Sequence, residues 1–265
     1  MITFSIITPT YNRKNIISDS IDSSLIFNKH QNMNEIIIVD DASKDNTHQY
    51  IKDSYKEELD RGQIAYKKLE TNRGVTYAKN YGAESAQNEW LIFLDSDDQL
   101  LFDANVTIIN AIKQFKDADI LFFRCIDNEM NLVGENITKS FKLNLNNYIK
   151  NGTFGECLPV IKRTKFLQYK YDSDLRGFEG LTYLRMLKED MNLYIIKEAA
   201  RKYDDRGIDR LSSRAGIFKR SVMILEGYKR YKYEIYNIIK SPLKIYLNLK
   251  IFQYYLLSLL SRLIK

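Results

Sequence analysis

The sequence predicts an α/β fold, with a mostly parallel sheet flanked by helices. Short apolar, β-branched runs alternate with segments whose apolar residues recur at helical spacing. The runs are apolar on both faces, which is typical of strands buried between two helical layers. With 265 residues, 45% of them hydrophobic, and no Pro-, Gly- or Ser-rich stretch, the chain can bury one large core.

The first strand is expected at residues 2–8, and Pro9 would end it. A helix at 13–28 follows, with Ile17, Ile21 and Leu25 on one face. Further strands are expected at residues 35–41, 63–69 and 90–94, and helices at 45–59, with Asp45 as N-cap, and 74–87. Strands that alternate with helices at this spacing predict parallel pairs joined by helical crossovers.

The pattern loosens after residue 100. Helices are expected at 105–115 and 180–190, strands at 119–125 and 192–200, and a helical segment from 217 to the end. Residues 127–178 show no strong period. The chain therefore divides into residues 1–100, residues 101–216 and a basic amphipathic helical tail at 217–265.

Composition excludes several classes of protein. The chain has two cysteines, Cys125 and Cys157, and two histidines, His30 and His48, too few for a disulfide framework or a typical zinc site. No Gly-x-Gly-x-x-Gly follows any strand, which excludes a dinucleotide oxidoreductase. The segment "TPTYNRKN" after the first strand has no glycine-rich phosphate loop, which argues against a sugar-nucleotide pyrophosphorylase. The N-terminus lacks a basic region before its apolar run, so we expect no signal peptide and a cytoplasmic location.

Polar residues gather at the carboxyl ends of three predicted strands. Asp95 to Asp98 follow the strand at 90–94, Asp40 and Asp41 end another, and residues 9–12 follow the first. Ligands of such sheets bind at this edge, so the three loops should converge. Carboxylates suit Mg²⁺ or Mn²⁺, and Asp-x-Asp lets one acid serve a metal and the other a ribose hydroxyl. For Asp98, a solvated helix N-cap is as good a reading as a direct role.

Four segments occur in a characteristic order: "SIITPTYNR" (5–13), "IIIVDDASKDNT" (36–47), "NRGVTYAKNYG" (72–82) and "FLDSDDQL" (93–100). Together they resemble the successive motifs of family 2 glycosyltransferases of the GT-A fold. The resemblance covers about the first hundred residues. It implies that residues 1–100 are the nucleotide-sugar-binding half and residues 101–216 the acceptor-binding half of the same domain. It implies an inverting transferase that uses a nucleotide-diphosphate sugar and a divalent metal, Mn²⁺ or Mg²⁺.

The resemblance also implies roles for individual residues. Asp97 and Asp95 would hold the metal, and Asp41 would accept a hydrogen bond from the uracil imide of a UDP-sugar. The implied nucleotide-binding residues are Pro9, Tyr11, Asp41, Asn72, Gly74, Lys79, Asp95 and Ser96. Lys79 departs from the family, which usually has Arg there, and Lys lacks the bidentate fork that would contact the diphosphate or base.

An inverting displacement needs a carboxylate base on the acceptor side. In relatives it commonly lies in a short acidic motif that opens a helix, and "LRGFEGLTYL" (175–184) occupies that place. Glu179 is the candidate base, although an acid there also favours the helix dipole; Gly180 stands where a second acid is often found. Asp172 and Asp174 are reserve candidates. Arg206 and Arg210 could meet the leaving diphosphate or form a surface charge run.

The net charge of +6 is concentrated in the tail. Residues 217–265 hold ten Lys or Arg against two acids, and their longest uncharged run is the eleven residues from 251 to 261, too short to span a bilayer. Basic and aromatic residues on a helix predict binding to a membrane surface at the inner face of the cell membrane. Packing on its own domain, or on a second subunit in a homodimer, is the alternative. No base-reading motif is present, so nucleic acid is not expected as a partner.

These observations predict a metal-dependent glycosyltransferase that moves a hexose or N-acetylhexosamine from a UDP-sugar to a hydroxyl. The acceptor would be a lipid-linked saccharide or polysaccharide of a surface glycan such as capsule, O-antigen or lipooligosaccharide. The alternative hypothesis is a catalytically inactive nucleotide- or glycan-binding partner of a glycan synthase. The intact Asp95-x-Asp97 favours the enzyme, whereas Gly180 leaves the alternative open.

Overall fold

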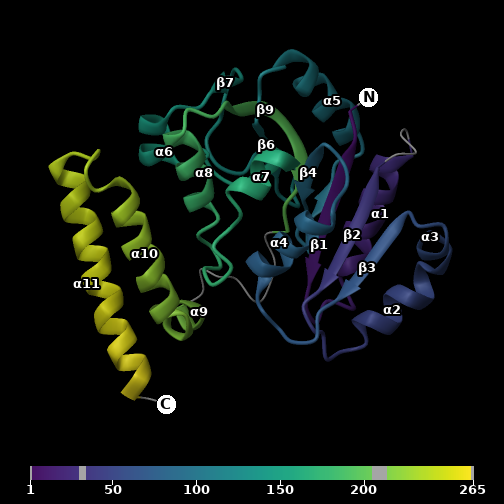
Figure 1. Ribbon diagram of the computed structural model, residues 1–265, viewed down its shortest axis with the longest axis horizontal. Helices are drawn as coiled ribbons and strands as arrows, with labels where there is room; N and C mark the ends of the chain where they lie inside the picture. Colours follow the sequence, from purple (N-terminus) through teal and green to yellow (C-terminus); the bar gives the residue numbers. More distant parts are fainter. Residues whose placement is uncertain (1, 30–33, 205–213, 264–265) are drawn as a thin grey trace.

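The computed structural model describes residues 2–29, 34–204 and 214–263, and its centre is one nine-stranded sheet (Figure 1). The strand order is β3-β2-β1-β4-β8-β6-β9-β5, and β7 pairs with β9 beside that path. The strands are β1 (Phe4–Thr10), β2 (Glu35–Asp40), β3 (Ile64–Lys68), β4 (Trp90–Phe93), β5 (Gln99–Leu100), β6 (Ile120–Ile126), β7 (Phe141–Lys142), β8 (Cys157–Lys162) and β9 (Leu193–Lys202).

Helices cover both faces of the sheet. They are α1 (Ile17–Asn28), α2 (Thr47–Ser54), α3 (Lys56–Asp60), α4 (Val75–Ser85), α5 (Ala104–Gln114), α6 (Leu145–Asn151), α7 (Arg163–Gln168), α8 (Gly180–Lys188), α9 (Arg214–Lys219), α10 (Ser221–Ile235) and α11 (Ser241–Leu263). One face packs on α4, α7 and α8, and the opposite face packs on α1, α2 and α5. Successive residues of β1 point to opposite faces of the sheet, with Ile6 in one hydrophobic cluster and Ile7 in the other. The predicted α/β class with two helical layers is confirmed.

The first four strands pair in parallel, as their alternation with helices predicted. Their carboxyl ends therefore share one edge of the sheet. Strand β1 continues through Pro9 to Thr10, so the expectation that Pro9 ends it was wrong. Beyond Ile7 this strand pairs only with β2, and a one-sided strand tolerates the missing N–H of proline.

The second half of the sheet contains a strand that the sequence did not predict. Strand β8 lies antiparallel between β4 and β6, with Pro159 opposite Phe122. No strand was expected at 157–162, which lies in the stretch without a strong period. Helices α6 and α7 and strand β7 also lie within residues 127–178, where the sequence showed no strong period.

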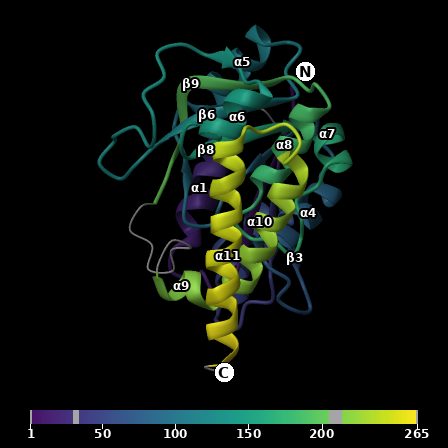
Figure 2. The same cartoon turned by 90° about the vertical axis from the view of Figure 1, so that its left-hand side faces the viewer.

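The C-terminal residues form a helical hairpin of α10 and α11, which confirms the predicted helical extension. Helix α10 contacts α8, and α11 lies on the outer side of α10 (Figures 1 and 2). Within the described residues, no helix is long and apolar enough to cross a membrane. One sheet runs through residues 4–202, so the boundary near residue 100 stays a functional prediction.

Candidate active site

The loops after β1 and β2 are tied together by the side chain of Asn12. Its amide oxygen accepts hydrogen bonds from the N–H groups of Lys44 and Asp45, at 2.8 and 3.3 Å. Its own N–H donates to Ser43 Oγ at 2.9 Å. These bonds cross about thirty residues of sequence, so Asn12 positions the two loops relative to each other.

The adjacent acids Asp40 and Asp41 have different partners. Asp40 is fully buried and accepts hydrogen bonds from the Ser43 N–H at 2.7 Å and from the Tyr66 hydroxyl. Asp40 therefore supports its own loop. Asp41 accepts from the N–H groups of Arg73 and Gly74, both at 2.7 Å, and so fixes the turn that opens α4.

Gly74 adopts φ +90° and ψ 160°, a conformation that only glycine adopts without strain. A Cβ built there would meet nothing within 4 Å. The backbone conformation, and not lack of space, therefore requires glycine at this position. Beside it, the Arg73 guanidinium lies 3.8 Å from the centre of the Tyr77 ring.

The remaining predicted nucleotide-binding residues lie at the same edge. Pro9 and Ser96 are buried at the ends of β1 and β4, whereas Tyr11 is 38% exposed and Asn72 is exposed. Asn80 donates to the Tyr171 carbonyl at 2.8 Å and to Ser173 Oγ at 3.1 Å. The edge of the sheet thus joins the loop that begins at residue 171.

Lys79 forms an ion pair with Asp95, its Nζ 2.8 Å from a carboxylate oxygen. The lysine side chain is 11% exposed and that of Asp95 is 40% exposed. Burial would raise the pKa of Asp95, but the Lys79 ammonium outweighs it and holds that pKa below its usual value. Sequence reasoning placed Lys79 against the nucleotide; its partner in the structure is the first acid of Asp-x-Asp.

Asp97, like Asp95, is a partly exposed acid of this loop. Burial and the Asp95 carboxylate raise its pKa, Asp204 adds to the effect, and Arg13 opposes it. Asp97 and Asp204 both line a cavity of about 150 Å³. Carboxylates that repel one another in this way form a place where a cation would be stabilised.

Asp98 is buried, and its carboxylate lies 3.0 Å from the Arg201 guanidinium. It also accepts a hydrogen bond from the Asp204 N–H at 3.1 Å. Burial raises the pKa of Asp98 to about 7 although Arg201 opposes the shift. The N-cap reading of Asp98 is wrong, because α5 begins at Ala104 with Asp103 as its N-cap residue. Sequence reasoning missed Arg201 and Asp204, whose only signal is their position at the end of a predicted strand.

Glu179 lies directly before α8 and is partly exposed. Its charge contributes to the raised pKa of Lys79, which places it on the same side of the molecule as Asp95. In the part of the chain that the structure describes, its carboxylate takes part in none of the observed hydrogen bonds or ion pairs. Arg176, another residue that sequence reasoning missed, lies in the same loop as Glu179, and its positive charge helps to lower the pKa of Asp95.

The reserve acids have partners. The Arg185 guanidinium binds both oxygens of Asp172, at 2.9 and 3.1 Å, and Arg230 binds both oxygens of Asp174, at 3.0 and 2.6 Å. Glu179 is therefore the acid of this segment whose lone pairs are available to a substrate. Arg206 and Arg210 lie outside the described residues.

The close approach of Tyr148 explains why residue 180 is glycine. The Tyr148 hydroxyl donates to the Gly180 carbonyl at 2.8 Å, and a Cβ built on Gly180 would lie 2.6 Å from that hydroxyl oxygen. Tyr148 thus fills the space that a second acid would need.

The donor set fits a divalent cation that shares its ligands with a substrate. Oxygen ligands suit Mg²⁺ or Mn²⁺, and the mutual repulsion that raises the pKa of Asp97 would be relieved by a cation. Among the described residues, no group of three or more His, Cys, Asp or Glu side chains could hold a metal alone. Such cations commonly take one or two carboxylates and complete their shell from phosphates and water.

Comparisons with known proteins identify the family of the chain. Residues 5–167 match the family model described as Glycosyl transferase family 2. A GalNAc(5)-diNAcBac-PP-undecaprenol beta-1,3-glucosyltransferase of Campylobacter jejuni is 28% identical over 248 residues, which are 91% of this chain and 75% of that protein. A putative teichuronic acid biosynthesis glycosyltransferase of Bacillus subtilis is 39% identical over 95 residues, 36% of each chain.

Solved structures share the fold. The crystal structure of Staphylococcus aureus TarS 1–349 in complex with UDP-GlcNAc has a TM-score of 0.69 at 17% identity and covers 96% of this chain and 72% of its own. A Pyrobaculum calidifontis mannosyltransferase in complex with GDP-Man and Mn²⁺ has a TM-score of 0.61 at 16% identity, covering 94% and 69%. At such identity these likenesses establish the architecture alone.

Proposed function

Because the chain belongs to glycosyl transferase family 2 and is a glycosyltransferase, we propose that it moves a hexose or N-acetylhexosamine from a UDP-sugar to a hydroxyl of a bacterial surface glycan. The observation that carries the proposal is the ion pair of Lys79 with Asp95, with Glu179 close enough to act on the pKa of the same lysine and Asp97 close enough to Asp95 to have its own pKa raised. Asp95 and Asp97 suit a metal–diphosphate, and the Glu179 carboxylate has no hydrogen-bond or ion-pair partner among the described residues.

The donor is proposed from the loops at the sheet edge. Tyr11 offers a partly exposed ring, and each carboxylate oxygen of Asp41 keeps a lone pair beyond its backbone hydrogen bond. Structures of TarS in complex with UDP and with UDP-GlcNAc have this fold, which supports a uridine nucleotide.

Asp97 and Asp95 would hold Mn²⁺ or Mg²⁺. When bound, the cation would neutralise charge that develops on the departing diphosphate. Lys79 keeps Asp95 ionised at neutral pH because it lowers the pKa of that acid. Arg13 and Arg176 add positive charge near Asp97 and Asp95 respectively, which favours a diphosphate at this place.

Glu179 is proposed as the base of a direct displacement. The acceptor oxygen attacks the anomeric carbon, the bond from that carbon to the diphosphate oxygen breaks, and the hydroxyl proton moves to Glu179. Asp172 and Asp174 are held by arginines, which leaves Glu179 as the acceptor-side acid. One displacement inverts the configuration of the sugar.

We also propose that α11 lies on an anionic membrane surface at the inner face of the cell membrane. Its outward side carries an apolar stripe with Ile245, Leu249 and Phe252 each about 60% exposed. The sequence from 235 to 265 contains five Lys or Arg and no acid, so a second copy would bring like charges together, whereas anionic lipid would not. A lipid-linked acceptor, as in the name of the Campylobacter relative, fits this location.

The activity is tested by UDP release from a panel of UDP-sugars with Mn²⁺, with and without EDTA. Wild type should hydrolyse one sugar slowly, and both EDTA and Asp97→Ala should abolish that turnover. Asp103→Ala, an exposed acid nearby in sequence, is the matched control and should retain it. If no nucleotide sugar turns over and no metal-dependent UDP binding occurs, the enzyme proposal fails. A partner glycan synthase that still binds Asp97→Ala would then support the inactive-partner hypothesis.

The membrane proposal is tested by sedimentation with vesicles. Wild type should sediment with phosphatidylglycerol vesicles and much less with phosphatidylcholine, and Leu249→Gln with Phe252→Gln should remain in the supernatant. A concentration-dependent dimer that these two changes dissociate, without vesicle binding, would favour the homodimer instead.

A further inference from the structure

The α10–α11 hairpin contacts the loop that carries the candidate base, residues 172–179. Arg230 of α10 binds both oxygens of Asp174, at 3.0 and 2.6 Å, and lies 3.4 Å from Asp172. Its Nε also lies 3.4 Å from Glu226, one turn earlier on the same helix. The guanidinium therefore joins α10 to two positions of one loop.

A second contact lies at the other end of the loop. The ring of Phe178, next to Glu179, packs on Gly227, where a built Cβ would lie 2.4 Å from the ring. The Phe178 ring also meets Tyr228 edge-on at 5.7 Å, and Tyr228 stacks on Tyr254 of α11 at 5.3 Å. Gly227 thus permits an approach that any larger residue would block.

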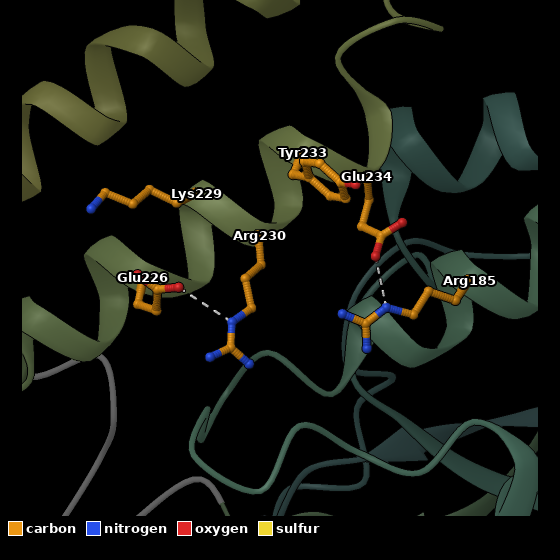
Figure 3. Close-up of a pocket in the computed structure, with 6 residues that line it drawn as sticks. All are labelled: Arg185, Glu226, Lys229, Arg230, Tyr233 and Glu234. Atoms are coloured by element: carbon orange, nitrogen blue, oxygen red, sulfur yellow. Dashed lines mark hydrogen bonds and ion pairs between the residues drawn. The ribbon is translucent and has the colours of Figure 1, made fainter.

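Helix α8 completes the attachment. Arg185 joins Asp172 to Glu234 of α10, whose carboxylate it meets at 2.8 Å, and Lys188 meets the same carboxylate at 2.7 Å. Figure 3 shows Arg185 beside Glu234, and Arg230 beside Glu226, around a pocket of about 400 Å³. Both arginines are paired, so this pocket is a joint between elements and not an anion site.

The opposite side of the loop is held by α4. Thr76 Oγ1 donates to the Ser173 carbonyl at 3.0 Å, and Asn80 donates to Ser173 Oγ. The same helix carries Lys79, the partner of Asp95. The loop is therefore clamped between a helix of the nucleotide-binding half and the C-terminal hairpin.

We propose that the hairpin is a brace for the base loop, with Arg230 as a positioning residue that holds Glu179 in register with the donor site. This inference rests on the proposed function. The fixed distance between base and donor decides the rate, because misplacement of a reacting group by about 1 Å can cost about a hundredfold in rate. UDP affinity should fall much less than the rate, since most of the proposed nucleotide site lies outside the braced loop, at the ends of β1, β2 and β4 and at the turn that opens α4. Within the braced loop, Arg176 is the residue proposed to favour the diphosphate.

The first experiment follows amide hydrogen exchange in Arg230→Met and in Lys229→Met, which removes the same charge from the next, exposed position of α10. Peptides that cover 172–179 should exchange faster in Arg230→Met alone, while peptides of α4 keep wild-type rates. Equal exchange in the two variants would overturn the brace.

The second experiment measures reaction and binding separately. With the UDP-sugar that wild type turns over, Arg230→Met should lose at least tenfold in kcat, while its Kd for UDP with Mn²⁺ stays within twofold. Arg230→Lys should recover part of the rate, and Lys229→Met should match wild type. A parallel loss of UDP binding, or an unchanged kcat, would overturn the positioning role.

Gly227→Ala keeps the proposal testable if Arg230→Met does not fold. The methyl group would displace the Phe178 ring without removing a charge, and alanine is a better residue than glycine for a helix interior. We expect the same loss in kcat with unchanged UDP affinity. Exchange at 172–179 could be faster in Arg230→Met than in wild type while wild type neither binds UDP nor turns over any nucleotide sugar. That result would keep the mechanical brace and reject both the proposed function and the role in catalysis.

Discussion

The Lys79 ammonium lies 2.8 Å from the Asp95 carboxylate and is almost completely shielded from solvent. This pair joins α4 to the loop after β4, so the negative charge of Asp95, the first acid of Asp-x-Asp, is already balanced by the Lys79 ammonium. Lys79→Met should lower the free energy of unfolding by about 1–2 kcal/mol, less than a fully buried pair because Asp95 is partly exposed. Urea unfolding measures this, and Lys79→Arg should lose less. A double-mutant cycle with Asp95→Asn that shows no coupling would contradict the assignment.

Asp97 and Asp98 are neighbours that should respond oppositely to amidation. Asp98→Asn leaves buried Arg201 without its closest carboxylate and should cost about 3 kcal/mol of stability. Asp97→Asn removes repulsion from Asp95 and should leave stability unchanged or higher, while activity is lost. Unfolding in urea without metal or nucleotide compares the two, and equal losses would refute the distinction.

Gly74→Ala should lower stability by about 1–3 kcal/mol through backbone strain alone, because space for the methyl group is open. The change should also weaken UDP binding, since the turn that Asp41 holds would shift. Gly62→Ala, at φ +71° with equally open space, is the control and should lose stability only. Calorimetric titration with UDP and Mn²⁺ separates the two effects; equal UDP affinity in both variants would exclude a role for the Gly74 turn.

Gly180→Ala should destabilise the protein by about 1–3 kcal/mol because its methyl group meets the Tyr148 hydroxyl. In a Tyr148→Phe background the same change should cost less, since the clashing oxygen is absent. Thermal unfolding of the four proteins of the cycle measures the difference. Identical costs in both backgrounds would show that Tyr148 does not limit residue 180.

Acid should weaken the joint between the base loop and the hairpin. Although burial raises the pKa of Asp172, its hydrogen bonds with Arg185 outweigh burial and hold the pKa below the ordinary value. A depressed pKa contributes stability above the unfolded value of about 3.9, and that contribution is lost as pH falls through the folded value. The difference in unfolding free energy between wild type and Asp172→Asn should therefore be full near about pH 6 and shrink below about pH 4. A difference independent of pH would contradict the ion pair.

Sequence reasoning succeeded where the evidence is local. The strands around Ile6, Ile37 and Ile92 were predicted because each is apolar on both faces, and their carboxyl ends placed the acids at one edge. It failed at β8, which lies in the stretch without a strong period and is paired by neighbours on both sides that are distant in sequence. It also read Asp98 as a candidate N-cap, since its partner Arg201 lies far away in the chain.

By itself the sequence determined which residues stand at the ends of strands, because hydrophobic periodicity and strand length are properties of neighbouring residues. Only the tertiary structure decided which of the acids are free to act. Asp98 pairs with Arg201, Asp172 and Asp174 pair with Arg185 and Arg230, and the Glu179 carboxylate takes part in none of the hydrogen bonds or ion pairs observed among the described residues. Those pairings depend on strand order and on the docking of α10, and the Coulomb energy that sets each acid's state depends on distance in space and not along the chain.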